Sequence, residues 1–387
     1  MPAHIAITAT TPDTVSVSYS STVQQPVVFG SLDETIPRSC SPVDPRTQKI
    51  KLRSLLERRG SNTSLTLDLN IAESLDMKSP PSDSSTLEYL SSTGKRLTRR
   101  QLRSYGNNPK KLDQEFADIP LHYAAKLDIP GASYKNRYNS IWPNKETMVV
   151  LRNNGSPDGY INANYIRGRN GNPRTFVATQ GPMPNTVDDF WALVWQERCP
   201  VIVMMTKLKE KNVVKCEPYF PNYEARYGDI RVFVHRKIMK NGYCVRDIEL
   251  VVSSEYPGAV FYKSLKKFYK NFTSLTERAA LFDGEHTKKG DTSHTLRHYW
   301  FTVWPDHKAP AATAALQLIE MIVEIETFRL EVENGPQQQC SGPTLVHCSA
   351  GLGRTGCYIT VSEGMQELKE QNTVDVLAIV CRLRLDR

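Results

Sequence analysis

A cysteine and an arginine six residues apart frame the segment of this chain with the clearest chemistry. The segment runs His347-Cys-Ser-Ala-Gly-Leu-Gly-Arg-Thr-Gly356 and follows Thr344-Leu-Val346, an apolar stretch typical of a strand. Gly351 and Gly353 allow the loop to turn its backbone N–H groups inward, and a helix predicted from Thr355 to about Glu370 adds positive potential at its N-terminus. A strand, a tight loop and a helix in this order predict a cradle for an anion.

The side chains in this cradle indicate what it does to the anion. Cys348 lies inside the loop, where its thiolate form is favoured because the surroundings suit negative charge. Arg354 is able to hold two oxygens of a phosphate in a bidentate fork. A thiolate nucleophile in a phosphate cradle predicts phosphoryl transfer through a cysteinyl-phosphate. The competing interpretation is a buried structural cysteine beside an arginine, which does not explain the order of residues between strand and helix.

A leaving group such as a tyrosyl oxygen, whose conjugate acid has a pKa near ~10, departs more easily when it is protonated. Asp306 in Trp304-Pro-Asp-His307 is the candidate general acid, about forty residues before the cradle. Trp304 would anchor a loop that closes, and Pro305 would stiffen it. By itself an aspartate after a proline is commonly a turn residue, so the assignment depends on the neighbouring cradle.

The elements that position these groups are strands mixed with helices. The continuous apolar run 201–205 predicts a buried strand, and the alternating run 230–235 predicts a half-buried one. Residues 186–196 and 311–332 are predicted as amphipathic helices. The fold class is therefore α/β, with a mixed β-sheet flanked by helices.

The composition divides the chain unevenly. All five Trp lie at or beyond Trp142, whereas residues 1–100 contain three aromatic residues and 29 Ser or Thr. Folding without large apolar side chains cannot offset chain entropy. We therefore expect a largely disordered N-terminal region, 1–112, followed by one domain, 113–387.

Several function classes are not supported by the sequence. We find no apolar run of membrane-spanning length and no secretory signal pattern. The eight Cys show neither a C-x-x-C pair nor zinc spacing, so no metal site is predicted, and reduced thiols point to a cytoplasmic protein with nuclear access open. The net charge of +8 suits anionic partners but is too small and too spread for nucleic-acid binding.

Within the N-terminal region, residues 51–69 have the pattern of a linear docking peptide. A basic head that includes Arg58 and Arg59 precedes an alternating apolar set that includes Leu65 and Leu67. An extended chain would present those leucines to one surface of a partner and the basic head to an acidic patch. The alternative is an edge strand packed on the protein's own domain. Leucines within 87–103 predict either short basic helices or a solvated charged face.

The catalytic motifs resemble those of the classical protein tyrosine phosphatases, a family with a twisted mixed sheet flanked by helices. The phosphate loop at 347–356 and the acid loop at 304–306 match, and so do further motifs along residues 113–387. These further motifs are Lys135-Asn-Arg-Tyr138, Asp158-Gly-Tyr-Ile-Asn-Ala-Asn-Tyr-Ile166, Thr179-Gln-Gly-Pro-Met183 and Lys209-Glu-Lys-Asn-Val-Val-Lys-Cys216.

The resemblance implies a role for each matching position, with no cofactor. Cys348 would be the nucleophile, Arg354 the phosphate clamp and Asp306 the acid and then the base. Thr355 would ease departure of the Cys348 thiolate, and His347 would support that thiolate. Tyr138 would wall a deep pocket that selects phosphotyrosine. The resemblance also implies further phosphate-loop residues and supporting residues, namely Ser349, Ala350, Gly351, Leu352, Gly353, Glu210, Lys215 and Trp304. Core packing is expected of Asp189, Trp191, Gln180 and Pro182.

The N-terminal region narrows the resemblance. Arg58-Arg-Gly-Ser-Asn-Thr-Ser-Leu-Thr-Leu67 resembles the kinase-interaction motif of the group that docks mitogen-activated protein kinases, such as the striatum-enriched and haematopoietic phosphatases. This implies that residues 51–69 dock such a kinase. Ser61, preceded by two arginines, is a candidate phosphosite for a basophilic kinase, and a phosphate there would weaken docking into an acidic groove.

Three departures from the family pattern qualify these expectations. Leu352 stands where Ile is usual, which is a nearly isosteric change. Residues from about Val252 to Asp283 form an expected insertion, interpreted as a surface elaboration, a partner site or a product of alternative splicing. The chain stops at Arg387, before the family's glutamine loop, so we expect a C-terminal truncation. A turnover-deficient chain that docks a kinase or traps phosphotyrosine is therefore the alternative to an active phosphatase.

Overall fold

The computed structural model describes residues 84–122, 127–152, 159–253, 292–304, 309–334 and 342–387. All of these residues belong to one unit of the chain, Arg59–Arg387. The expected docking segment 51–69 with Ser61 and the candidate acid Asp306 lie outside the described residues. So does most of the expected insertion 252–283, of which only the first two residues are described.

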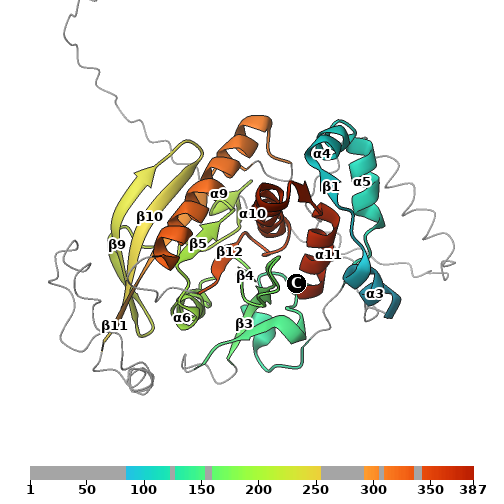
Figure 1. The fold of residues 1–387 in the computed structure, drawn as a ribbon. Coiled ribbons are helices and arrows are strands. Elements are labelled where there is room, and N and C mark those ends of the chain that lie inside the picture. Colours follow the sequence, from blue (N-terminus) through green and yellow to red (C-terminus); the bar gives the residue numbers. More distant parts are fainter. Residues whose placement is uncertain (1–83, 123–126, 153–158, 254–291, 305–308, 335–341) are drawn as a thin grey trace, which may run out of the picture. The chain divides into compact units, whose positions relative to one another are not determined.

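A mixed sheet of nine strands, counted within the described residues, forms the centre of the fold (Figure 1). The strand order is β2-β3-β4-β12-β5-β11-β10-β9-β8. The four strands β4, β12, β5 and β11 run parallel, and the strands on either side of them pair antiparallel. The strands are β2 (Met148–Val150), β3 (Tyr160–Ile166), β4 (Phe176–Thr179), β5 (Val201–Met204), β8 (Glu224–Tyr227), β9 (Ile230–Met239), β10 (Tyr243–Val252), β11 (Thr292–Phe301) and β12 (Thr344–His347).

Two apolar clusters cover the two faces of this sheet. Helix α6 (Val187–Glu197) packs in one cluster, and helices α9 (Ala312–Glu333) and α10 (Gly353–Gln371) pack in the other. Strand β12 contributes Leu345 to the first cluster and Val346 to the second, because successive side chains of a strand point to opposite faces. The strand that leads into the candidate cradle is therefore fixed from both sides.

Three helices precede the domain; the first packs against its C-terminal helix, the second packs against the third, and the end of the third contacts the C-terminal helix. They are α3 (Ser84–Ser92), α4 (Arg99–Gly106) and α5 (Pro109–Asp118), and the C-terminal helix is α11 (Val376–Asp386). Thr98 and Gln101 form a capping box at the start of α4, and β1 (Leu97–Thr98) pairs with β13 (Thr373–Val374). Buried Leu90, Ile119 and Cys381 form a separate apolar cluster there. Shorter elements are η1 (Ala132–Lys135), η2 (Lys145–Thr147), β6 (Lys209–Glu210) and β7 (Val213–Val214).

The expected α/β fold is confirmed, and the predicted elements of the domain lie within a few residues of the observed ones. The N-terminal boundary differs. Helices α3 and α4 lie in the region for which the composition predicts mostly disorder, and the expected boundary at Asp113 falls inside α5. The leucines of 87–103 form short helices with Leu90 and Leu97 buried, while the charged side chains of α4 remain outside the core.

The described residues bear on two expectations, one about membrane-spanning segments and one about the state of the cysteines. The described part of the chain contains no helix that is both long enough and apolar enough to cross a membrane. Six of the eight cysteines are described, and each of these is a free thiol.

Candidate active site

The phosphate loop, residues 347–354, follows the carboxyl end of β12 at the centre of the parallel strands. Gly351 takes a left-handed conformation with a φ of 74°, and a Cβ built there would stand 2.3 Å from the Thr179 carbonyl oxygen. This turn directs the Gly351 N–H toward the Cys348 Sγ, which accepts it at 3.3 Å. The loop therefore presents a backbone donor to the thiol, as expected for an anion cradle.

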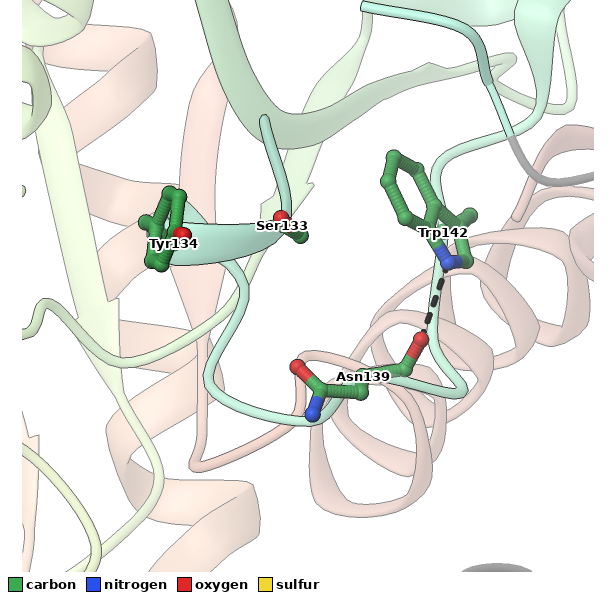
Figure 2. A pocket seen from close by; sticks show the side chains of 4 residues that line it. All are labelled: Ser133, Tyr134, Asn139 and Trp142. Carbon is green, nitrogen blue, oxygen red and sulfur yellow. Dashed lines mark hydrogen bonds between the residues drawn. The ribbon is translucent and has the colours of Figure 1, made fainter. Parts of the chain in front are cut away.

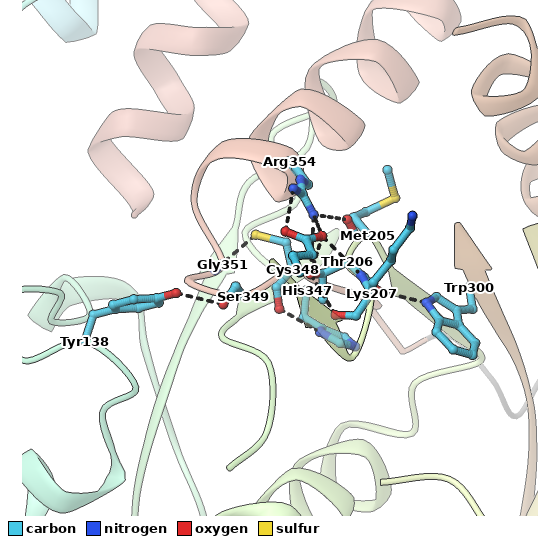
Figure 3. A network of polar contacts seen from close by, with 11 residues as sticks. Tyr138, Met205, Thr206, Lys207, Trp300, His347, Cys348, Ser349, Gly351 and Arg354 are labelled. Atoms are coloured by element: carbon cyan, nitrogen blue, oxygen red, sulfur yellow. Dashed lines mark hydrogen bonds and ion pairs between the residues drawn. The ribbon is translucent and has the colours of Figure 1, made fainter. Parts of the chain in front are cut away.

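Arg354 is held at the start of α10 by a buried bidentate ion pair (Figure 3). Its guanidinium donates to the two carboxylate oxygens of Glu210 at 2.5 and 3.0 Å. The Thr206 hydroxyl accepts from the same guanidinium at 3.4 Å. Both charged side chains are less than one-tenth exposed, so the pair is well shielded from water. The hairpin of β6 and β7 thus supplies the carboxylate that pairs with Arg354.

Tyr138 contacts the loop from a different segment. Its hydroxyl shares a 2.9 Å hydrogen bond with the Ser349 Oγ. Gln180 anchors the segment by accepting from the Arg137 N–H at 2.9 Å and donating to the Lys135 carbonyl at 2.7 Å. Lys135 also forms a 3.1 Å ion pair with Asp189. Gln180 and Asp189, which the sequence assigned to core packing, therefore hold the segment that carries Tyr138.

His347, the residue directly before Cys348, is buried. Burial lowers the pKa of His347 to about 4, and the nearby Arg137 charge acts in the same direction. Its Nδ1 lies 3.1 Å from the Cys348 carbonyl oxygen and must donate, because a carbonyl only accepts. Thr355 is also buried, and its hydroxyl has no hydrogen-bond partner among the described residues.

Arg387 supports the loop from outside. Its guanidinium donates to the carbonyl oxygens of Gly351 at 2.8 Å and Ala350 at 3.1 Å, and to the side-chain oxygens of Asn162 and Asn164 at 2.8 Å each. When the Ala350 carbonyl accepts from Arg387, the N–H of the same peptide, which belongs to Gly351, faces the opposite way, toward the Cys348 sulfur. Arg387, the residue directly after helix α11, therefore helps to set the orientation of the loop.

The structure brings together most of the site residues predicted from the sequence. Around Cys348 it places His347, Ser349, Gly351, Arg354, Glu210 and Tyr138. Trp304 is buried against Phe301, and Lys215 donates its backbone N–H to the Leu208 carbonyl at 2.8 Å. The expected approach of Lys215 to Asp306 lies outside the described residues.

Other supporting residues were missed by sequence reasoning. Arg137 lies inside a recognised motif, and Tyr219 lies three residues after another. Arg137 donates its backbone N–H to Gln180, and the Tyr219 hydroxyl lies 2.8 Å from the His347 Nε2, so both act through residues that are distant in the sequence. Arg387 follows a run of alternating Leu and Arg that has no spacing signal for loop support.

A pocket of about 400 Å³ opens beside the Tyr138 segment (Figure 2). It is lined by Ser133, Tyr134, Asn139 and Trp142, and the Trp142 indole N–H donates to the Asn139 carbonyl at 2.9 Å. The lining contains neither the thiol nor the guanidinium, so this pocket is separate from the cradle.

A buried thiol that accepts a backbone N–H in a tight loop, with an ion-paired arginine at the start of the next helix, defines a cysteine-dependent phosphatase site. The sequence profile of the protein-tyrosine phosphatase family matches residues 132–387, and the chain belongs to that family.

The relatives agree with this assignment. The chain is 41% identical to receptor-type tyrosine-protein phosphatase R of Mus musculus over 89% of this chain and 47% of the relative. It is 37% identical to tyrosine-protein phosphatase non-receptor type 5 of Rattus norvegicus, over 89% of this chain and 84% of the relative. It is also 37% identical to the non-receptor type 7 enzyme of Homo sapiens, over 89% and 85%. The chain spans about half the length of the receptor-type relatives.

Proposed function

We propose that this protein hydrolyses phosphotyrosine in proteins through a cysteinyl-phosphate intermediate. The proposal rests on one observation: the Cys348 sulfur accepts the Gly351 N–H in the same loop that leads to Arg354, whose guanidinium is held by Glu210. The sulfur forms a bond to phosphorus while the bond from phosphorus to the tyrosyl oxygen breaks, and Asp306 gives its proton to that oxygen. Water then splits the sulfur–phosphorus bond and returns a proton to Asp306.

Cys348→Ser tests the chemical step. Phosphate release from a phosphotyrosine peptide should fall by at least about a thousandfold, because the weaker nucleophile leaves only the binding contribution. Cys357→Ser, a thiol change in helix α10 beyond the loop, should retain the activity. Equal rates for wild type and Cys348→Ser would contradict the proposal. One phosphate released per chain without turnover would instead indicate a phosphotyrosine-trapping protein.

The wall formed by Tyr138 supports a preference for phosphotyrosine over shorter phosphoresidues. Its hydroxyl is tied to Ser349 of the loop, so its ring can stack beside a substrate ring that reaches the thiol. Activity on phosphothreonine peptides at a comparable rate would favour a dual-specificity enzyme and count against this part of the proposal.

We further propose that residues 51–69 direct the enzyme to mitogen-activated protein kinases in the cytoplasm and, where accessible, the nucleus. Support comes from the basic head and alternating leucines of that segment. The double variant Leu65→Ala, Leu67→Ala should bind such a kinase at least about tenfold more weakly than the full wild-type chain does, because it lacks two apolar anchors. Calorimetric titration measures this difference. Leu75→Ala, outside the segment, is the control, and unchanged binding by the double variant would reject docking.

Ser61 would regulate the same docking. Ser61→Glu places negative charge next to Arg58 and Arg59, which should weaken attraction to an acidic groove by several-fold. Ser61→Ala should bind as wild type does in the same titration. If Ser61→Glu also binds as wild type does, phosphorylation at this position is not a docking switch.

A further inference from the structure

A line of four buried side chains connects strand β10 to the candidate nucleophile. Arg246 on β10 and His298 on β11 are direct cross-strand partners, and the Arg246 guanidinium lies 3.3 Å from the His298 Nδ1. The Tyr219 hydroxyl lies 2.7 Å from the His298 Nε2 and 2.8 Å from the His347 Nε2. Since β5 separates β11 from β12 in the sheet, Tyr219 bridges the two histidines across that strand.

The chemistry of the end groups fixes the direction of each bond in this line. Arg246 has only donors, so His298 Nδ1 must accept and, in a neutral ring, its Nε2 carries the proton. At the other end the Cys348 carbonyl only accepts, so His347 Nδ1 carries the proton and its Nε2 must accept. The single hydroxyl proton of Tyr219 therefore goes to His347, and the Tyr219 oxygen accepts from His298.

The burial of the line supports neutral rings. His298, His347 and Tyr219 are fully buried, and burial lowers the pKa of both histidines. A doubly protonated His347 would donate from both nitrogens and leave the Tyr219 proton without an acceptor in the line. Among the described residues, the other charged or titratable groups that face Tyr219 and His347 are Arg137, Cys216 and Cys348.

Arg246 is an unusual start for such a line. It is only 4% exposed, and its cation lies 4.1 Å from the ring centre of Phe220 and 5.3 Å from that of Trp300. Within the described residues its side chain forms no ion pair with a carboxylate. The buried Arg246 cation therefore donates its hydrogen bond to His298, on the path toward the site, and not to a neighbouring carboxylate.

We propose that Arg246, His298 and Tyr219 are positioning residues that fix the tautomer of His347, so that its Nδ1–H and the aligned dipoles behind it favour the thiolate of Cys348. This deepens the proposed phosphatase function and rests on it. Aligned hydrogen bonds in a buried line polarise one another, which is why the charge on Arg246 is felt beyond its own contact. All three residues act through His347, and the structure places none of them at the sulfur.

Nitrogen NMR of the wild-type protein tests the tautomers without any variant. Long-range proton–nitrogen spectra of histidine-labelled protein should show His347 protonated at Nδ1 and His298 at Nε2, with assignments from His347→Gln and His298→Gln. A His347 protonated at Nε2 would overturn the proposal.

The rate of Cys348 alkylation by iodoacetamide as a function of pH, followed by mass spectrometry, tests the effect on the thiolate. Tyr219→Phe and Arg246→Met should each move the midpoint of the profile upward by about 0.5–1 pH unit, which slows alkylation below the midpoint about three- to tenfold. Arg246→Lys restores a charged donor and should restore most of the midpoint. Tyr165→Phe removes a phenol hydrogen bond to Glu197 elsewhere and should leave the midpoint unchanged.

The outcomes separate this proposal from the proposed function, because neither measurement uses a phosphorylated substrate. Shifted midpoints in a chain that releases no phosphate would reject the phosphatase function and leave the line of donors in place. Wild-type midpoints in folded Tyr219→Phe and Arg246→Met, with normal phosphate release, would reject the line alone. Circular dichroism establishes which variants are folded. If one of the two is not folded, the other and the wild-type tautomers decide.

Discussion

Gly351 bears the sharpest steric requirement in the phosphate loop. Its left-handed backbone is costly for residues with a Cβ, and the added carbon would meet the Thr179 carbonyl on β4. The same conformation aims its N–H at the Cys348 sulfur. Because residue 351 has no Cβ, the loop can present its N–H to the sulfur; an added Cβ would force the loop to change its conformation.

Gly351→Ala should lower the free energy of unfolding by at least about 2 kcal/mol and phosphate release by at least about tenfold, since both the backbone angle and the close contact are violated. Urea denaturation and a phosphotyrosine-peptide assay measure the two effects. Gly106→Ala, at the end of α4 with no atom near its added carbon, should be neutral or slightly stabilising. Equal stability of Gly351→Ala and wild type would contradict the steric argument.

Site residues could be predicted from the sequence where they lie together in one short motif. Cys348, Arg354 and the loop glycines lie within eight residues, so their order alone indicates a cradle. Glu210 and Tyr138 needed the family resemblance, because they reach the loop from segments far away in the chain. Arg246, His298 and Tyr219 escaped both routes. Each is an ordinary sheet or loop residue until strand register brings it into line.

Elements were predicted well where apolar period and length agree. The helix predicted at 186–196 is α6, and the one predicted at 311–332 is α9, each displaced by a single residue. The helices α3 to α5 were the weak point, because their sequence is short, basic and poor in aromatic residues. α3 and the end of α5 share an apolar cluster with α11, while α4 packs on α5 and β1, and composition does not reveal such contacts between distant segments.

Leu90 tests this dependence on packing. It is 3% exposed in the cluster with Ile119 and Cys381, so Leu90→Ala should lower the free energy of unfolding by about 2–4 kcal/mol. Leu87→Ala changes the same residue type in the same helix at a position that is 41% exposed, and should cost less than about 0.5 kcal/mol. Both are measured by urea denaturation. Similar costs for the two variants would show that α3 does not depend on this cluster.

The molecule as a whole carries several buried ionisable groups with opposite pH effects. His294, His298 and His347 are buried, and burial lowers the pKa of each, to about 4 for His294 and His347. Burial instead raises the pKa of Glu363 and Asp386. As pH falls, the histidines are protonated in the unfolded chain before they are protonated in the folded one, whereas these two carboxyl groups are protonated first in the folded protein.

The unfolding free energy should therefore decrease as pH falls from about 6.5 toward 4, with a slope of up to about 1.4 kcal/mol per pH unit for each histidine. Urea denaturation at pH 7, 6 and 5 measures this slope. His294→Gln keeps a donor for the Cys199 carbonyl but cannot be protonated, so it should reduce the slope by up to one histidine's share. A flat profile for wild type would contradict neutral burial of these rings.

The position of β12 has a consequence for the time at which this protein acquires its activity. β12 inserts between β4 and β5, pairing Thr344 with Phe176 and Leu345 with Ile202, so the centre of the sheet joins segments made at very different moments of synthesis. At roughly 5–20 residues per second, β4 and β5 wait on the order of 10 s for their shared neighbour. Such distant pairing also slows folding itself. The proposed docking segment thus leaves the ribosome long before Cys348 is synthesised, so docking, if it occurs as proposed, can precede any catalysis.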